Sequence, residues 1–345
     1  MRLLTLGLLV AVRFASAAVV EDAKCEQTGP NTYRIEFRAA AGQMPVSIYA
    51  SSRADRIDRA EPVLLARSSP ADVTVAGAAG RVYFHLKPVS GPVRVVSIRR
   101  LPLEGAPNFR DIGGYRTADG RYTKWGVIYR AGALSRLTAK DYDYLAPLGI
   151  RLVCDLRIDR ERANAPTRWA GANPPQILPE TIDTITWVPE GMEPKQRMLT
   201  VYKRLPFDAS APLADMVHRI LKGETPTMFH CSAGKDRTGT FAAFLLTALG
   251  VPFPTIREDF LLTNRYLVPE ERAAELAAET QKRLKLDKPP DLQTLRYLLG
   301  VDADYLDVAF KVINEKFGSF DGYWREQLKL TPADLTALRQ KLLED

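Results

Sequence analysis

The sequence predicts an α/β protein with a central, mostly parallel sheet and a helical C-terminal part, preceded by a small all-β sandwich. Three observations predict this order. Residues 25–100 carry short runs in which apolar and polar side chains alternate, a pattern typical of half-buried strands. After residue 107, apolar strand patterns alternate with helical patterns, as expected for a parallel sheet with crossover helices. From Phe241 to the end the pattern is almost wholly helical.

The composition is ordinary for a folded protein. Of the 345 residues, 46% are hydrophobic and 26% are charged, which excludes a disordered tail, a collagen-like repeat and a multi-span membrane protein. At about 100–200 residues per domain, the length fits two domains. The 48 Lys and Arg residues exceed the 41 Asp and Glu residues, giving a formal net charge of +7. This excess favours anionic partners without naming them.

The first 17 residues have the pattern of a secretory signal peptide. Arg2 precedes the apolar run Leu3–Val10, and the small residues Ala15–Ala17 follow it. The apolar run is shorter than the about 20 residues of a membrane-spanning helix. The sequence therefore predicts export, either to the periplasm or out of the cell. The chain has 3 cysteines, and an odd number in an exported protein predicts at least one free thiol.

The sandwich is predicted from five strand-like runs and the turn residues between them. His85 lies in one of the runs and is expected to be structural rather than a ligand. The segment Leu101–Pro107 contains two prolines and a glycine, which predicts a domain boundary between residues 25–100 and 105–345. The five runs are Tyr33–Arg38, Val46–Ser51, Val73–Ala76, Val82–Lys87 and Val93–Arg99.

The elements after the boundary follow from capping residues and from apolar runs. Thr138 and Asp141 form a capping-box pattern that opens a helix ending near Leu145. Ile150–Leu156 has few polar residues, as expected for a strand covered on both faces. Ser319 and Thr331 are expected to cap the last two helices. Further strands are predicted at Thr184–Val188 and Thr227–His230, and further helices at Leu213–Leu221 and Phe241–Leu249.

One segment carries the chemistry: residues 230–239, His-Cys-Ser-Ala-Gly-Lys-Asp-Arg-Thr-Gly, between an apolar strand and an apolar helix. At such a junction, unpaired N–H groups and the helix dipole form an anion site of about the size of a phosphate. Gly234 allows the loop to curl so that its amides face inward. The positive environment favours the thiolate of Cys231, a nucleophile. Arg237, six residues on, can bind two phosphoryl oxygens with its planar fork.

The remaining loop residues are expected to bind the substrate. Ser232 and Ala233 contribute backbone amides, and Thr238 can donate a hydrogen bond to the Cys231 sulfur. Lys235 is either a second cation for the substrate or an ordinary solvated lysine. The loop lacks the G-x-x-x-x-G-K-[S/T] order of a nucleotide-binding loop, and Ser232-x-x-Lys235 lacks the companion motifs of β-lactamases.

The C-x5-R arrangement resembles the signature loop of the protein tyrosine phosphatase superfamily. Residues 105–343 resemble the bacterial tyrosine phosphatases that include the secreted mycobacterial phosphatases of proteins and phosphoinositides. The resemblance implies a phosphocysteine mechanism, no metal or cofactor, and a helical lid at about 269–288; it does not cover residues 25–100. It rests on Asn108–Gly114, Tyr129–Gly132, Cys154–Arg157, Lys235–Arg237 and the helical tail around Tyr323 and Leu335.

The general acid has three candidates, because the sequence lacks the Trp-Pro-Asp tripeptide of the best-known phosphatases. Asp236 is preferred, since it resembles the aspartate of other Lys-Asp-Arg loops. Asp155 lies at the end of a predicted strand, where ligands bind in open sheets, although it can instead form a salt bridge with Arg157 or Arg237. Glu190 ends a Trp-Val-Pro-Glu stretch.

Two further groups stay open between a functional and a structural role. Arg110, Asp111 and Arg130 either line the cleft or form a structural clamp at the start of the domain. Cys154 either packs in a buried strand or forms a reversible disulfide that protects Cys231 from irreversible oxidation.

The predicted function is a phosphomonoesterase, first a protein-tyrosine phosphatase with dual specificity open, and alternatively a phosphoinositide or inositol-phosphate phosphatase. A reading of another class is an inactive module that only binds phosphorylated ligands. The expected partner is a phosphorylated protein or a phosphoinositide, not a nucleic acid. Peripheral membrane contact stays open, and no obligate protein partner is predicted.

Overall fold

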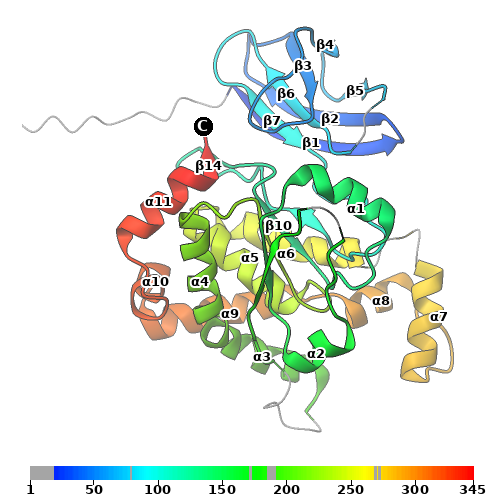
Figure 1. The fold of residues 1–345 in the computed structure, drawn as a ribbon, viewed down its shortest axis with the longest axis vertical. Coiled ribbons are helices and arrows are strands. Elements are labelled where there is room, and N and C mark those ends of the chain that lie inside the picture. The colour runs from blue at the N-terminus through cyan, green and yellow to red at the C-terminus, as the bar shows by residue number, and fades with distance from the viewer. Residues whose placement is uncertain (1–18, 78–79, 171–172, 185–191, 268–269, 271–272) are drawn as a thin grey trace, which may run out of the picture.

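The computed structural model describes residues 19–345, apart from 78–79, 171–172, 185–191, 268–269 and 271–272. A β-sandwich lies at one end of the molecule, and a larger α/β part forms the rest (Figure 1). The predicted signal peptide at residues 1–17 lies outside the described residues, so it stays a prediction.

The sandwich consists of two antiparallel sheets, ordered β1-β2-β5 and β4-β3-β6-β7. Alternate side chains of the second strand, Tyr33, Ile35 and Phe37, are buried in the core between the sheets. This alternation confirms the period-2 pattern from which the strands were predicted. The strands are β1 Val20–Gly29, β2 Thr32–Ala39, β3 Val46–Ser51, β4 Leu64–Ala66, β5 Ala71–Thr74, β6 Tyr83–Lys87 and β7 Arg94–Ser97.

All five predicted strands of the sandwich form, but β1 and β4 were not predicted. β1 begins at Val20, ahead of the predicted domain start, and most of its outward-facing side chains are charged or exposed. A strand with so little apolar alternation leaves a weak signal. His85 is buried, and its Nε2 lies 2.9 Å from the Arg53 carbonyl oxygen. The expectation of a structural histidine is confirmed.

The α/β part is built on a five-stranded sheet ordered β12-β11-β13-β10-β8. The first four strands in this order pair in parallel, and only β8 runs antiparallel to its neighbour β10. This confirms the predicted mostly parallel sheet. A separate two-stranded sheet joins β9 to β14 near the C-terminus. The strands are β8 Arg110–Asp111, β9 Tyr122–Thr123, β10 Ile128–Ala131, β11 Leu152–Asp155, β12 Gln176–Pro179, β13 Thr227–His230 and β14 Leu343–Glu344.

Helices cover both faces of this sheet. Met228 of β13 and Val153 of β11 face a core that includes Leu145, the last residue of α1. Phe229 and Cys154 face the opposite, larger core, which contains most of α5. The predicted burial of β11 on both faces is thus confirmed.

The capping predictions are confirmed at Thr138, Ser319 and Thr331, each of which accepts a hydrogen bond from a backbone N–H of its helix. The helix predicted from Phe241 begins earlier, at Asp236, because its first turn belongs to the loop itself. The helices are α1 Ala139–Leu145, α2 Asp159–Asn164, α3 Pro194–Asp208, α4 Ser210–Leu221, α5 Asp236–Ala248, α6 Phe253–Leu267, α7 Ala273–Leu284, α8 Leu292–Leu299, α9 Ala303–Phe317, α10 Phe320–Glu326 and α11 Pro332–Leu342.

The strand predicted at Thr184–Val188 lies mostly outside the described residues, and Thr184 itself is not in a strand. The edge strand of the sheet is instead β12, at Gln176–Pro179. Three of its four residues are exposed, so it lacks the apolar run that reveals a central strand.

Buried polar contacts join the sandwich to the α/β part. Arg81 of the sandwich donates to Asp111 at 2.6 Å, and both side chains are buried. Trp125 packs in the core of the sandwich and donates its Nε1–H to the Val95 carbonyl at 3.0 Å. Breaking a buried ion pair leaves an uncompensated charge. The sandwich is therefore held in a defined place beside the α/β part.

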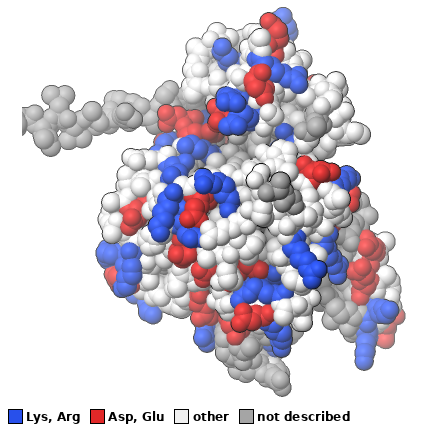
Figure 2. Space-filling view, viewed as in Figure 1, with Lys and Arg blue, Asp and Glu red and all other residues white. Residues whose placement is uncertain are grey.

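The net positive charge does not form one broad basic field on the face shown in Figure 2, where blue and red side chains are interspersed. Extended nucleic-acid footprints are clustered basic patches or stripes. This face has no such stripe among the residues drawn in colour.

Candidate active site

Residues 231–235 form the loop between β13 and α5, as the strand-loop-helix pattern predicts. Cys231 is buried at the carboxyl end of the central strand. Lys235 caps α5 without a side-chain hydrogen bond to the first turn. The amides of that turn, together with the helix dipole, can therefore serve an anion in front of Cys231.

Gly234 shapes the loop and anchors it. Its φ of +70° lies in the left-handed region, and a Cβ there would come within 2.5 Å of the Ala131 backbone. Its carbonyl oxygen accepts hydrogen bonds from Asn108 Nδ2 at 2.7 Å and from Arg130 Nη2 at 3.1 Å. Only glycine fits this conformation and this close approach.

Arg110 and Arg130 form the structural clamp that was one of their two expected roles. Both are fully buried and pair with Asp259 of α6, at 3.2 and 2.8 Å. Burial raises the pKa of Asp259, but the two guanidinium charges lower it further, so the pKa lies well below its usual range. Asp111 faces away to Arg81. The charged cluster thus holds Arg130 against the loop.

Arg237 is held by Glu161 of α2, a residue that the sequence did not single out. Its Nη1 and Nη2 donate to the two carboxylate oxygens of Glu161 at 2.6 and 2.8 Å. Ser232 Oγ also donates to Glu161, at 2.6 Å. Burial raises the pKa of Glu161, but the bonds from Arg237 and Ser232 lower it to about 2. Glu161 therefore stays ionised and orients the guanidinium at the loop.

Asp236 is the first residue of α5, five positions after Cys231 in the sequence. Its Oδ1 accepts a hydrogen bond from the Tyr202 hydroxyl at 2.9 Å. Burial, and then the charge of Asp236, raise the pKa of Tyr202 well above its usual value. Tyr202 is thus a neutral donor, and the Asp236 carboxylate is partly exposed, with 21% of its side-chain surface open. A partly exposed, oriented carboxyl group is suited to proton transfer.

Asp155 is engaged in the salt bridge that was its alternative role. It accepts bonds from Arg157 Nε and Nη2 at 2.8 and 2.7 Å and is only 2% exposed. Burial raises its pKa, but the bond from Arg157 and the His230 charge lower it below its usual value. A carboxylate so paired holds its charge instead of donating a proton. This arrangement favours Asp236 over Asp155 as the acid.

Lys235 and Thr238 were both expected to contribute to the phosphate site. Lys235 Nζ donates to the Gly300 carbonyl at the end of α8, at 3.0 Å. The Thr238 hydroxyl is buried, and no hydrogen-bond partner for it lies among the described residues. The expected hydrogen bond from Thr238 to the Cys231 sulfur is therefore not formed in this structure.

Three other expectations concern Cys154, Glu190 and the predicted lid at 269–288. Cys154 is buried in β11, and the structure has Cys154 and Cys231 as free thiols, so the reversible disulfide stays a prediction. Glu190 lies outside the described residues. The helical lid expected at 269–288 corresponds to α7, which lies beside α8 at the edge of the molecule and away from α5 (Figure 1).

The residues that sequence reasoning missed orient the loop from a distance in the chain: Glu161, Tyr202 and Asp259. Asn108 was noted only as part of the Asn108–Gly114 motif and not as a residue of the site. Glu161 is separated from Arg237 by 76 positions, and Asp259 from Arg130 by 129. No local pattern connects such pairs. The only sequence signal for Glu161 and Asp259 is their negative charge, which many surface residues share.

Neither a metal cluster nor a membrane-spanning helix occurs within the described part of the chain. No group of three or more His, Cys, Asp or Glu side chains there could hold a metal ion. No helix there is long and apolar enough to cross a bilayer.

Comparison with known proteins finds a family that matches the α/β part of the chain. Residues 101–344 match the model described as the tyrosine phosphatase family. A provisionally named tyrosine-protein phosphatase of Cupriavidus necator is 33% identical over 68% of this chain and 86% of its own length. The triple specificity protein phosphatase PtpB of Mycobacterium tuberculosis is 30% identical over 72% of this chain and 100% of its own.

Proposed function

The chain belongs to the tyrosine phosphatase family, and from this premise we propose how its residues hydrolyse a phosphotyrosyl substrate. The observation that carries the proposal is the buried Cys231 before the N-terminus of α5, where no capping side chain bonds the amides of the first turn. Glu161 holds Arg237 beside this loop. Together they supply a nucleophile and a binding site for a phosphoryl group. The protein acts as a protein tyrosine phosphatase.

In the first step, the Cys231 thiolate attacks phosphorus while the bond from phosphorus to the ester oxygen breaks. The loop amides and Arg237 stabilise the charge on the three equatorial oxygens. Asp236 donates its proton to the leaving phenoxide, which departs as tyrosine. The product of this step is a thiophosphate ester on Cys231.

In the second step, water attacks the phosphorus of that ester, and the bond from sulfur to phosphorus breaks. Asp236, now a carboxylate, accepts a proton from the water. Inorganic phosphate leaves, and Cys231 returns to the thiolate. Tyr202 holds the Asp236 side chain in place through both steps.

Asp236→Asn tests the acid assignment. Turnover of a phosphotyrosyl peptide should fall by about 10²- to 10³-fold, because the departing phenoxide loses its proton donor. Turnover of 4-nitrophenyl phosphate should fall much less, since 4-nitrophenoxide leaves without protonation. The measurement is kcat for both substrates.

Asp155→Asn is the comparison variant for this test. It should lower kcat for both substrates by a similar factor, because it disturbs the Arg157 pair without removing a proton donor. If Asp155→Asn showed the leaving-group dependence and Asp236→Asn did not, the assignment would move to Asp155.

We propose phosphotyrosyl protein as the first substrate, with phosphoinositide or inositol phosphate as the alternative. The printed name of the mycobacterial relative speaks of triple specificity for that protein. Assays on phosphotyrosyl, phosphoseryl and phosphoinositide substrates would rank the classes. A module that only binds phosphate is disfavoured, because the loop retains both Cys231 and Arg237.

We also propose that the protein is exported. The support is the order of Arg2, the apolar run Leu3–Val10 and the small residues Ala15–Ala17. N-terminal sequencing of the protein recovered from a native host should find a chain that starts near Ala18. A full-length chain confined to the cytoplasm would contradict export.

A further inference from the structure

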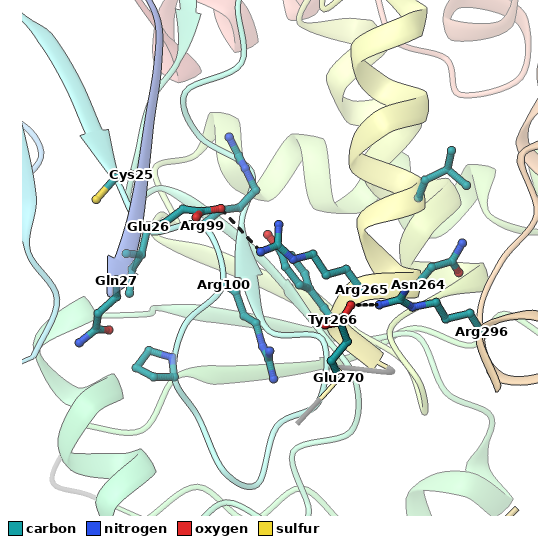
Figure 3. A pocket seen from close by; sticks show the side chains of 13 residues that line it. Cys25, Glu26, Gln27, Arg99, Arg100, Asn264, Arg265, Tyr266, Glu270 and Arg296 are labelled. Atoms are coloured by element: carbon teal, nitrogen blue, oxygen red, sulfur yellow. Dashed lines mark hydrogen bonds and ion pairs between the residues drawn. The ribbon is translucent and has the colours of Figure 1, made fainter. Parts of the chain in front are cut away.

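A large pocket lies where the sandwich meets the α/β part. It has a volume of about 920 Å³ and is lined by β1, the segment Ile98–Pro102, α6 and α8. Figure 3 shows β1 on one side of it and the helical residues Arg265 and Arg296 on the other. The family match starts at residue 101, so one wall of this pocket is outside it.

The pocket is rich in arginine. Arg99, Arg100, Arg265 and Arg296 line it, against the acidic residues Glu26 and Glu270. In Figure 3 the arginines are spread along the pocket from the side of β1 to the side of α8, and they do not converge on one point. An extended ligand with several negative charges matches such a row better than a single compact anion.

Two of the arginines are only loosely committed to the protein. Arg265 lies 3.6 Å from Glu26, and both side chains are about two-thirds exposed. Arg296 lies 3.4 Å from Glu270, whose side chain is 76% exposed. Exposed pairs of this kind contribute little to stability. An incoming carboxylate can therefore exchange with either glutamate at small cost.

Arg296 also carries a donor that the protein leaves unused. Its Nε–H is shielded from solvent, and among the described residues nothing accepts a hydrogen bond from it. A buried donor without an acceptor is costly.

The pocket continues toward the catalytic loop. Asn264 and Arg296 also line a second cavity of about 250 Å³, together with Val301 and Tyr305. Tyr305 stacks on Tyr202 with ring centroids 5.2 Å apart, and Tyr202 donates to Asp236. The two cavities share Asn264 and Arg296. We call them together the arginine groove; β1 lines one end of it and Tyr305, the neighbour of Tyr202, lines the other.

The residue before this second cavity is tied to the loop directly. Gly300 accepts the hydrogen bond from Lys235 Nζ at 3.0 Å, and Val301 N donates to Asn264 Oδ1 at 2.7 Å. The catalytic loop, the end of α8 and α6 are therefore linked by hydrogen bonds. The second cavity therefore lies next to residues that contact the catalytic loop.

We propose that the arginine groove binds an acidic stretch of the polypeptide on one side of the substrate phosphotyrosine, so that the sandwich helps to select substrates. This inference rests on the proposed phosphatase activity. An extended chain is favoured because β1 is an edge strand, paired with β2 alone among the described strands. Edge strands can accept a further extended segment.

The test compares three phosphotyrosyl peptides of equal length, with three glutamates before the phosphotyrosine, three after it, or none. For the unaltered protein, kcat/KM should be about tenfold higher for one of the two acidic peptides than for the neutral one. The preference should decline as salt rises, because the groups involved are partly exposed.

The variant is the double substitution Arg265→Gln with Arg296→Gln, and the matched control is Arg325→Gln, an exposed arginine on α10. The ratio of kcat/KM for acidic and neutral peptides should fall to about one in the double variant and stay at the unaltered value in the control. Melting temperatures of all proteins would identify a folding defect.

The outcomes separate the inference from the function on which it rests. If the unaltered protein hydrolysed neither peptides nor 4-nitrophenyl phosphate, the proposed function would fail. If it hydrolysed all peptides equally well, or if the double variant kept the preference, only the arginine groove would be wrong. If the double substitution lowered turnover of phosphoinositide vesicles and left peptide selectivity intact, the groove would recognise a lipid headgroup, which contradicts the proposal.

Discussion

Cys231→Ser should reduce turnover of a phosphotyrosyl peptide by about 10⁴-fold or more, because a neutral serine hydroxyl is a far weaker nucleophile than a thiolate. His230, the residue before Cys231, is buried, and burial lowers its pKa to about 4. The His230 Nδ1 lies 3.3 Å from the Cys231 carbonyl oxygen, so the imidazole faces the backbone. The chemistry therefore depends on a thiolate.

Binding should survive the Cys231→Ser substitution. The amides at the start of α5 and the Arg237 guanidinium are unchanged, so the variant should bind a fluorescent phosphotyrosyl peptide at least as tightly as the unaltered protein. Steady-state kinetics and fluorescence anisotropy give the two readouts. A variant that retained more than about one hundredth of the original kcat would show that Cys231 is not the nucleophile.

Arg237→Lys should reduce kcat/KM by about 10²- to 10³-fold, even though it keeps the positive charge. Lysine presents a point charge, whereas the planar fork of arginine binds two oxygens. Glu161 also orients this fork through two hydrogen bonds. The transition state of phosphoryl transfer has its charge on the equatorial oxygens, where this fork acts. Kinetics with a phosphotyrosyl peptide measure the loss.

Glu161→Gln is the companion variant, because it leaves the guanidinium and removes only its orienting charge. Its kcat/KM should fall by about tenfold, less than for Arg237→Lys, since the loss is one of positioning. Glu161 is ionised in the unaltered protein, with a pKa lowered to about 2, so the size of this loss should not vary with pH across the neutral range. Equal losses in the two variants would mean that the planar fork of Arg237 contributes nothing beyond the orientation that Glu161 provides.

The outline of the fold could be predicted because its signals are local. The central strand Thr227–His230 is an apolar run bounded by polar residues, and it forms at the predicted positions. Thr138 and Thr331 mark the starts of their helices, because each accepts a hydrogen bond from the backbone N–H three residues later. The catalytic loop is equally local, since its nucleophile and its arginine lie six positions apart.

The support of the site could not be predicted, because its contacts join distant parts of the chain. Arg130 meets Asp259 only after α6 packs beside the sheet, and Arg237 meets Glu161 only after β11 and β13 pair. The choice between Asp155 and Asp236 had the same origin. In the sequence, Asp155 ends a predicted strand and Asp236 lies in the loop, so both were candidates. The ion pair of Asp155 with Arg157, which only the structure shows, distinguishes them.

The sandwich illustrates a third limit. Its strand β2 alternates clearly and was predicted, whereas the edge strand β1 has a polar pattern and was not. That strand is also the wall of the arginine groove. An edge strand that stays polar and exposed carries little signal in the sequence, although it offers backbone groups to a ligand.

The central claim is that Cys231 carries the phosphoryl group during turnover. Rapid mixing with a phosphotyrosyl peptide, acid quenching within milliseconds and mass spectrometry of the digested protein test it directly. We expect a peptide containing Cys231 with one added phosphoryl group, more abundant in Asp236→Asn if water activation is slowed. Turnover without any phosphorylated Cys231, or with the phosphoryl group on another residue, would contradict it.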